Sequence, residues 1–207
     1  NDYNNGVPIG EWYTETFDSV RVALHKPSEM VQRRHRHFAM DKNTLKGRIN
    51  IAMSKLKQMY PTKQIVIMTP IHRAYFGSSD KNIQPDEMYE NVRGIFFDEY
   101  VKAIKEAGNV WAVPVIDLNS HSGLFPLYDA GAQMFNKPNT DRLHPNDAGH
   151  SRMAKTIMQQ LLLALHVLEK SQVLASYIAS TCIIHRKCLP DASGQTQTHY
   201  IRKHGNE

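Results

Sequence analysis

The sequence predicts an α/β domain built on a parallel β-sheet. Two short apolar segments rich in β-branched residues, 64–70 (QIVIMTP) and 109–119 (NVWAVPVIDLN), are typical of buried strands. Segments with helical spacing of apolar residues lie before, between and after them. This alternation favours a parallel sheet, and near-continuous apolar strands fit a sheet that is covered on both faces. Pro114 favours an edge position or a bulge for the second strand.

The first predicted helix lies between residues 41 and 61. Its apolar positions step by three and four from Leu45 to Met59. Asp41 or Asn43 is expected to cap its start, and Pro61 marks its end.

Two further helices are predicted. One occupies 85–108, where Asp86 and Glu87 favour the start and Gly108 the stop. The other runs from about Asn146 to about Leu168, with apolar residues at helical spacing. Ligands of open α/β sheets gather at the carboxyl ends of the strands, so the segments after the two strands and the loop near residue 141 are the places to look for a site.

Composition sets broad limits. At 207 residues, 41% of them apolar and 22% charged, the chain fits one globular domain. No apolar run reaches the roughly 18 residues of a membrane helix, so no membrane span is expected. Two cysteines do not make a disulfide framework. The first residue is Asn and no leader sequence follows, so either a leader was removed or the chain is a fragment. The compartment stays open for the same reason. A signal peptide upstream would imply secretion or export to a periplasm.

Residues 21–48 are strongly basic, with eight Lys or Arg against two acids. One interpretation is a nucleic-acid binder whose salt-sensitive retention of DNA or RNA depends on Arg33, Arg34 and Arg36. No aromatic residues interleave with the charges as a stacking platform requires. A solvated, basic surface loop is therefore favoured, and no nucleic-acid partner is expected.

The segment TDRLHPNDAGHSRMA, residues 140–154, places Asp141 three residues before His144. A carboxylate that accepts from imidazole Nδ1–H orients the ring and stabilises the imidazolium, so the pair fits a general base. Asn146 or Asp147 is a candidate cap for the following helix. A turn former beside a helix start is the alternative. A metal set with His150 is not favoured, because six residues separate the two histidines.

The same residues resemble a known family. DRLHPNDAGHSRMA is similar to the final sequence block of the SGNH, or GDSL-type, serine hydrolases, including the small residue at Gly149. YPTKQIVIMTP and VPVIDL resemble two strands of that family, so the resemblance covers about residues 1–168. It implies a flavodoxin-like, three-layer α/β/α sandwich with a parallel sheet. It also implies that His144 is the base and that Asp141 orients it.

The chain starts with Asn1 and Asp2, which resemble the end of the family's Gly-x-Asn-Asp block. The resemblance implies that Asn1 donates its side-chain amide to an oxyanion hole. No Gly-Asp-Ser block occurs, and the second-block Gly is absent too. We therefore expect a partial domain whose early strands and serine nucleophile lie upstream. Such a chain is expected to be inactive by itself and prone to aggregation.

Other residues are candidates for substrate binding. Trp12 and Tyr13 are expected either to form a wall of the substrate pocket or to pack against the next helix. His72 and Arg73 follow the first strand. They are expected either to contact a polar or anionic substrate or to be part of a plain surface loop. Asp117 is expected to cap or turn the loop after the second strand.

Two segments depart from the family pattern. Residues 6–40 resemble a variable loop over the active site, expected to act as a lid or substrate collar. Residues 169–207 are predicted to be a tail, disordered at 193–198, and an origin outside the domain stays open. Its zinc-finger-like set of cysteines and histidines has unsuitable spacing, and a plain tail is favoured. The set is Cys182, Cys188, His199 and His204.

The resemblance to this family implies an ester hydrolase that transfers an acyl group to water. The expected substrate is a small-molecule or carbohydrate ester, with deacetylation of a sugar as the first choice. No metal and no organic cofactor is expected. The alternative is a non-catalytic module of the same fold that binds a carbohydrate or a partner. The acyl group, the alcohol and the oligomeric state stay open.

Overall fold

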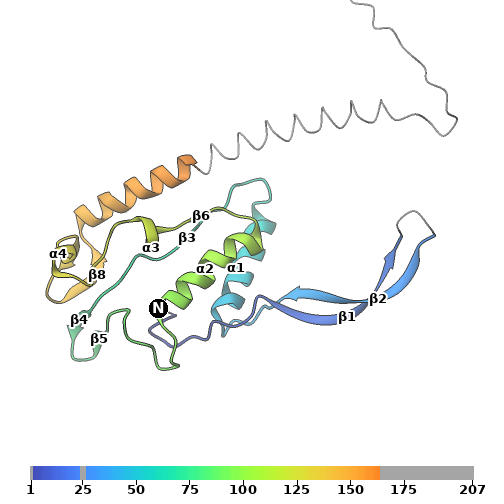
Figure 1. Ribbon diagram of the computed structural model, residues 1–207, viewed down its shortest axis with the longest axis horizontal. Coiled ribbons are helices and arrows are strands. Elements are labelled where there is room, and N and C mark those ends of the chain that lie inside the picture. Colours follow the sequence, from blue (N-terminus) through green and yellow to red (C-terminus); the bar gives the residue numbers. More distant parts are fainter. Residues whose placement is uncertain (1, 24–26, 164–207) are drawn as a thin grey trace, which may run out of the picture. The chain divides into compact units, whose positions relative to one another are not determined.

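The computed structural model describes residues 2–23 and 27–163 (Figure 1). Residues up to Leu161 form one compact unit. The predictions for Asn1 and for residues 164–207 lie outside the described residues. Among the described residues, no helix is long and apolar enough to cross a membrane.

A small parallel sheet confirms the α/β class. Strand β3 (Ile67–Met68) pairs with β6 (Val115–Ile116) in parallel, and the Ile67 N–H donates to the Pro114 carbonyl at 3.0 Å. Both strands are shorter than predicted, and residues 109–111 belong to a helix. The three-layer sandwich that the family resemblance implies stays a prediction.

Helix α1 (Leu45–Met59) lies where the apolar spacing predicts it. Its cap is Thr44, whose hydroxyl accepts from the Gly47 N–H at 3.1 Å. The two predicted caps were wrong. Asp41 instead accepts from the Asn43 N–H at 2.9 Å, which closes a turn one step before the helix.

Helix α2 (Phe97–Trp111) starts about ten residues later than predicted. Asp86 accepts from the Met88 N–H at 2.9 Å, and the following residues form turns rather than a helix. Asn91 accepts from the N–H groups of Arg93 and Ile95, and Gly94 has a φ of 74°. A side chain that satisfies these backbone donors favours a turn over a helix.

Gly108 was predicted to stop this helix, but the helix runs on to Trp111 and ends at Ala112, which takes the left-handed φ of 50°. A Cβ at Gly108 would lie 2.4 Å from Val115 Cγ2. The glycine therefore permits close packing of α2 on β6.

The core lies between helices α1 and α2 and the N-terminal segment. Tyr3, Leu45, Phe97 and Tyr100 are buried there, and the Tyr3 ring meets the Phe97 ring edge-on at 5.5 Å. The Tyr100 hydroxyl donates to the Val7 carbonyl. These contacts fix residues 2–9 against α1 and α2.

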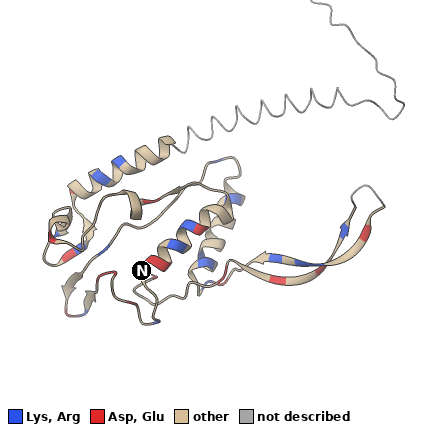
Figure 2. Ribbon diagram, viewed as in Figure 1, with Lys and Arg blue, Asp and Glu red and all other residues tan. Residues whose placement is uncertain are grey.

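Residues 13–22 and 29–38 pair as two antiparallel strands of a hairpin, not the loop that the sequence predicts. Strand β1 (Tyr13–Val22) pairs with β2 (Glu29–Phe38) over ten residue pairs, from Tyr13 opposite Phe38 to Val22 opposite Glu29. Most side chains on both faces are exposed. Figure 2 shows acidic and basic residues along both strands.

Asn50 anchors the base of this hairpin. Its side chain is fully buried, and its amide donates to the Trp12 and Ala39 carbonyls at 2.9 Å each. Its oxygen accepts from Trp111 Nε1 at 3.0 Å. The Trp111 ring in turn stacks on Phe38 at 4.2 Å. One residue of α1 therefore joins both hairpin ends to the end of α2.

A four-stranded antiparallel sheet was not predicted. Its order is β5-β4-β8-β7. The strands are β4 (Phe76–Ser79), β5 (Asn82–Gln84), β7 (Phe135–Lys137) and β8 (Asp141–Pro145). The segment predicted as an Asp–His loop is thus strand β8. Two short helices, α3 (Leu118–His121) and α4 (Asp129–Ala132), lie between β6 and β7.

Residues 147–163 are helical, which confirms the predicted last helix as far as the described residues extend. Asn146 caps it by accepting from the Gly149 N–H at 3.1 Å, one of the two caps that the sequence predicts. The Asn146 amide also donates to the Gln133 and Phe135 carbonyls. The cap therefore ties the helix to the segment that leads into β7.

We expect Asn50→Ala to lower the free energy of unfolding by about 2–3 kcal/mol, because it leaves buried donors and acceptors without partners. Urea denaturation followed by circular dichroism measures this change. The matched control is Asn109→Ala, at an exposed position of α2. Equal effects of both substitutions would contradict the anchoring role.

Candidate active site

Asp141 and His144 form the hydrogen-bonded pair that the sequence predicts. His144 Nδ1 lies 3.0 Å from Asp141 Oδ1 and 3.1 Å from Oδ2. The Asp141 side chain is 8% exposed and that of His144 is 60% exposed. The acid is thus inside the protein and the ring is at its surface, which suits a base that is held from behind.

Asp141 accepts more than the imidazole. The backbone N–H groups of His144 and Leu143 donate to its Oδ1 at 3.0 and 3.2 Å, and the Asn136 amide donates to Oδ2 at 3.1 Å. Burial by itself raises the pKa of this carboxyl. The hydrogen bonds from His144, Asn136 and Leu143 outweigh it and hold the pKa below its usual value near 3.8. The carboxylate is therefore charged at neutral pH and accepts from the ring.

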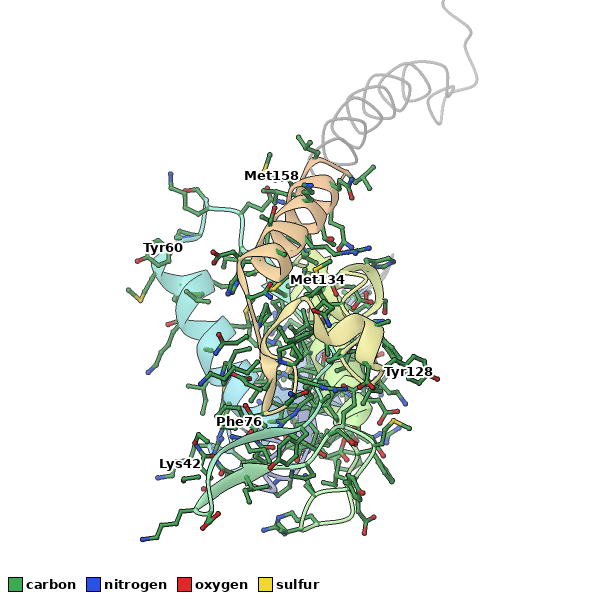
Figure 3. The ribbon with its side chains drawn as sticks, turned by 90° about the vertical axis from the view of Figure 1, so that its left-hand side faces the viewer. Lys42, Tyr60, Phe76, Tyr128, Met134 and Met158 are labelled. Atoms are coloured by element: carbon green, nitrogen blue, oxygen red, sulfur yellow. The ribbon has the colours of Figure 1, made fainter. Side chains whose placement is uncertain are left out.

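Strand pairing places the pair in the sheet. Asp141 opposes Phe76 of β4 and Lys137 of β7. The Phe76 ring, labelled in Figure 3, meets the His144 ring edge-on at 5.2 Å. Arg142 donates to the Pro138 carbonyl and to Asp129 at 2.6 Å, which fixes the strand between the pair's two residues.

The helix behind the pair packs closely on the preceding segment. A Cβ at Gly149 would lie 2.3 Å from the carbonyl oxygen of Met134, a residue labelled in Figure 3, and 2.8 Å from Pro145 Cβ. Only glycine fits at this distance from a backbone atom. The small residue of the sequence motif therefore has a packing reason.

His144 Nε2 is the nitrogen that would take a proton. Within residues 2–23 and 27–163, no serine hydroxyl is hydrogen-bonded to this ring, whose polar contacts are all to Asp141. The sequence by itself does not tell whether one of the chain's own serines folds next to His144. The roles of His144 as a base and of Asp141 as its orienter stay predictions, and the structure gives the hydrogen-bonded pair on which they rest.

An apolar groove of about 640 Å³ runs beside the pair. Its lining includes Leu143 and Pro145, which flank His144 in β8, together with Thr69, Tyr100 and Met153. The His144 ring itself is not part of this lining. Alternation along a strand explains this, because residues 143 and 145 point to the opposite face from residue 144.

His72 and Arg73 lie after β3, as predicted, but both are engaged by the protein. His72 Nδ1 lies 2.5 Å from Glu87 Oε1. The Arg73 guanidinium is buried and donates to Asn4 at 2.8 Å and to Gln84 at 3.0 Å. Burial lowers the pKa of Arg73. Substrate binding by these two side chains stays a prediction, and Arg73 reaches the groove as one of its lining residues.

Trp12 and Tyr13 lie at the hairpin base. Trp12 is buried and its Nε1 donates to Glu106 of α2 at 2.9 Å. Tyr13 packs on Phe38 at 5.6 Å. Neither lines the groove beside the pair. Trp12 thus contacts the next helix, where Lys46 Nζ of α1 lies 5.4 Å from its ring centre, whereas Tyr13 contacts strand β2; substrate binding by either residue stays a prediction.

Asp117 caps α3 by accepting from the Ser120 N–H at 3.1 Å, as predicted. Burial opposes ionisation here, but hydrogen bonds from Lys105, Ser120 and Thr69 hold the pKa of Asp117 far below its usual range. This acid is structural.

His150 does not join Asp141 and His144 in a metal-ligating group among the described residues. Sequence reasoning missed Asn136 and Glu87. Asn136, in strand β7, donates to Asp141, and Glu87 is the carboxylate that contacts His72; no local sequence pattern marks either role.

The sequence matches no family model and no curated protein. It is similar in fold to solved structures. One has 25% identity and a TM-score of 0.58 over 79% of this chain and 60% of that chain. A protein from Lactobacillus plantarum has 22% identity and a TM-score of 0.56 over 77% of this chain and 61% of its own.

A third structure is a possible lipase from Chitinophaga pinensis, with 21% identity and a TM-score of 0.51 over 76% of this chain and 68% of that one. The chain thus spans about three fifths of the length of the first two structures. Sequence identities of 21–25% indicate a shared fold. An argument about activity has to rest on the residues of the candidate site.

We expect Gly149→Ala to destabilise the protein by about 1–3 kcal/mol, because the new methyl group collides with the Met134 carbonyl. Thermal unfolding measures the change. Ser151→Ala, at an exposed position of the same helix, is the matched control. Unchanged stability of the Gly149 variant would show that the close approach is not required.

The lowered pKa of Asp141 predicts an acid-dependent contribution to stability. A carboxyl whose pKa is lower in the folded state stabilises fully above its unfolded pKa of about 4 and loses this contribution as pH falls through the folded value. Hence the difference in unfolding free energy between wild type and Asp141→Asn should shrink below about pH 4. Urea titrations from pH 6 to pH 2 would show it, and a difference constant over that range would refute the assignment.

Proposed function

We propose that this chain is part of an SGNH-type ester hydrolase that transfers an acyl group to water through a serine. The observation that carries the proposal is the Asp141–His144 contact, with Nδ1 at 3.0 Å from a buried carboxylate. The similarity in fold to a possible lipase supports it. The resemblance of residues 140–154 to the family's last block also supports it, because Asp141 and His144 stand in the same order and at the same spacing as in that block.

In this mechanism, His144 Nε2 takes the proton of a serine hydroxyl while the serine oxygen attacks the ester carbonyl carbon. The protonated ring then gives that proton to the departing alcohol, which leaves an acyl-enzyme. Water repeats the cycle, and the acid product leaves. Asp141 stabilises the positive ring throughout, since its carboxylate stays charged at neutral pH.

The proposal assigns the serine to a Gly-Asp-Ser block encoded upstream of Asn1, and the oxyanion donor to the Asn1 amide. Such a donor is typically worth about 3 kcal/mol in the transition state. Substrate esters of carbohydrates or of other small alcohols are proposed on the resemblance, with acetyl esters of sugars first. The residues that act need no metal or organic cofactor for these steps.

A chromogenic acetyl ester tests the proposal on two proteins, the 207-residue chain and the product of the whole gene that encodes it. We expect no turnover by the chain. We expect turnover by the gene product that falls at least about 10³-fold in His144→Ala and about 10⁴-fold in Asp141→Asn. His150→Ala, an exposed histidine on the next helix, is the control and should keep wild-type turnover.

An inert gene product that still binds the ester would favour the non-catalytic binding module instead. Turnover that does not depend on His144 would rule out the assigned base. Turnover by the 207-residue chain that His144→Ala abolishes would show that the nucleophile lies within these residues.

A further inference from the structure

A second cluster of histidine and carboxylate lies on the β1–β2 hairpin, away from the Asp141–His144 pair in sequence. In the antiparallel register, Thr16 faces His35 and Thr14 faces His37. Because side chains alternate between faces, Asp18, His35 and His37 lie on one face of the hairpin. His35 Nδ1 is 2.6 Å and His37 Nε2 is 3.8 Å from the same oxygen, Asp18 Oδ2.

Each of the three residues offers one ligand atom, and all three atoms lie within 4.8 Å of one another. This is the only such group among the described residues, 2–23 and 27–163. The two imidazole rings lie 4.1 Å apart, centre to centre. Side chains that are about half exposed have room to adjust: His35 is 57% exposed, and His37 and Asp18 are 46% exposed.

We propose that Asp18, His35 and His37 bind one divalent transition-metal ion of the zinc class, with water in the remaining positions. Two imidazole nitrogens and one carboxylate oxygen are ligands that Zn²⁺ accepts. Tetrahedral ligands at about 2.0 Å from the ion lie about 3.3 Å from one another. The two measured separations, 2.6 and 3.8 Å, lie on either side of that value. Small rotations of the side chains therefore suffice.

The charges around the cluster bear on this proposal. On the opposite face, Glu15 pairs with Arg36 at 2.9 Å and with Arg34 at 3.4 Å. That carboxylate engages two of the three arginines of β2, while Asp18 contacts the histidines and accepts from the Thr16 hydroxyl at 3.3 Å. Arg33 faces Asp18 in the register and donates to the Gln32 carbonyl. Its charge opposes a cation, and Arg33→Gln should strengthen binding.

The bound ion would join the two strands. An isolated two-stranded hairpin is marginally stable in water, and this one exposes most of its side chains. Ligands on both strands turn the ion into a cross-link, since Asp18 belongs to β1 and the histidines to β2. The proposed role is structural and does not depend on the hydrolase proposal.

A metal and a plain ion pair make opposite demands on the histidines. An ion pair with Asp18 needs a protonated ring, whereas a metal needs the neutral ring. The groups that face the cluster are Asp18, the two histidines and Arg33, all from the hairpin itself. Protons therefore compete with the metal for the ring nitrogens, whereas an ion pair with Asp18 requires a proton on the ring.

The test uses the full 207-residue chain, purified without a histidine tag, with Cys182→Ser and Cys188→Ser so that the thiols of the tail take no metal. Titration calorimetry with ZnCl₂ should give one ion per chain. His35→Gln with His37→Gln should weaken binding at least about tenfold, and Asp18→Asn should also weaken it. The matched control, His144→Gln with His150→Gln, should leave binding unchanged.

Hydrogen exchange gives a second readout, because Zn²⁺ bound at a different site would not change the protection of amides in the hairpin. Zn²⁺ should increase protection of amides in β1 and β2, and this effect should vanish in the His35 and His37 double variant. Mg²⁺ should not bind, because it prefers oxygen ligands. Absence of Zn²⁺ binding, equal loss in the two double variants, or equal binding of Mg²⁺ would overturn the proposal.

Discussion

The buried carboxylate of Asp141 is the constraint on which the candidate site depends. A charge taken out of water costs several kcal/mol unless its oxygens are hydrogen-bonded. Here two backbone N–H groups, an Asn136 amide and an imidazole all donate to it. The N–H groups of residues 143 and 144 reach Oδ1 only when the chain curls back on Asp141. The conformation that satisfies the acid is therefore the one that positions the His144 ring.

The segments on either side make that conformation rigid. Asn146 donates to the carbonyls of Gln133 and Phe135 and caps the helix over residues 147–163. Gly149 lets that helix lie against Met134. A functional side chain is held best when its strand and the following helix are both fixed by contacts that do not involve it. His144 meets this condition although its ring is mostly in solvent.

The sequence predicts features that depend on neighbouring residues, and it does not predict the pairing of strands that lie far apart in the chain. The Asp141–His144 pair, the last helix and α1 follow from spacings of three or four residues. Strands β4 and β7 carry no alternation of apolar and polar residues, so their pairing with β8 has no sequence signal. The hairpin was missed because both its faces are polar. The late start of α2 depends on Asn91 and Gly94, whose turn competes with a helix of suitable apolar spacing.

The hairpin also changes how its charge is interpreted. Two of its arginines are paired across the strands, since Glu15 contacts Arg34 and Arg36, and Asp18 contacts His35. A strand pair that neutralises part of its own charge offers less attraction to a polyanion than the composition indicates. It is joined to the helices through Asn50, whereas the hydrogen bonds to the Asp141 side chain come from residues 136, 143 and 144. Within residues 2–23 and 27–163, no hydrogen bond or ion pair joins a residue of the hairpin to Asp141 or His144.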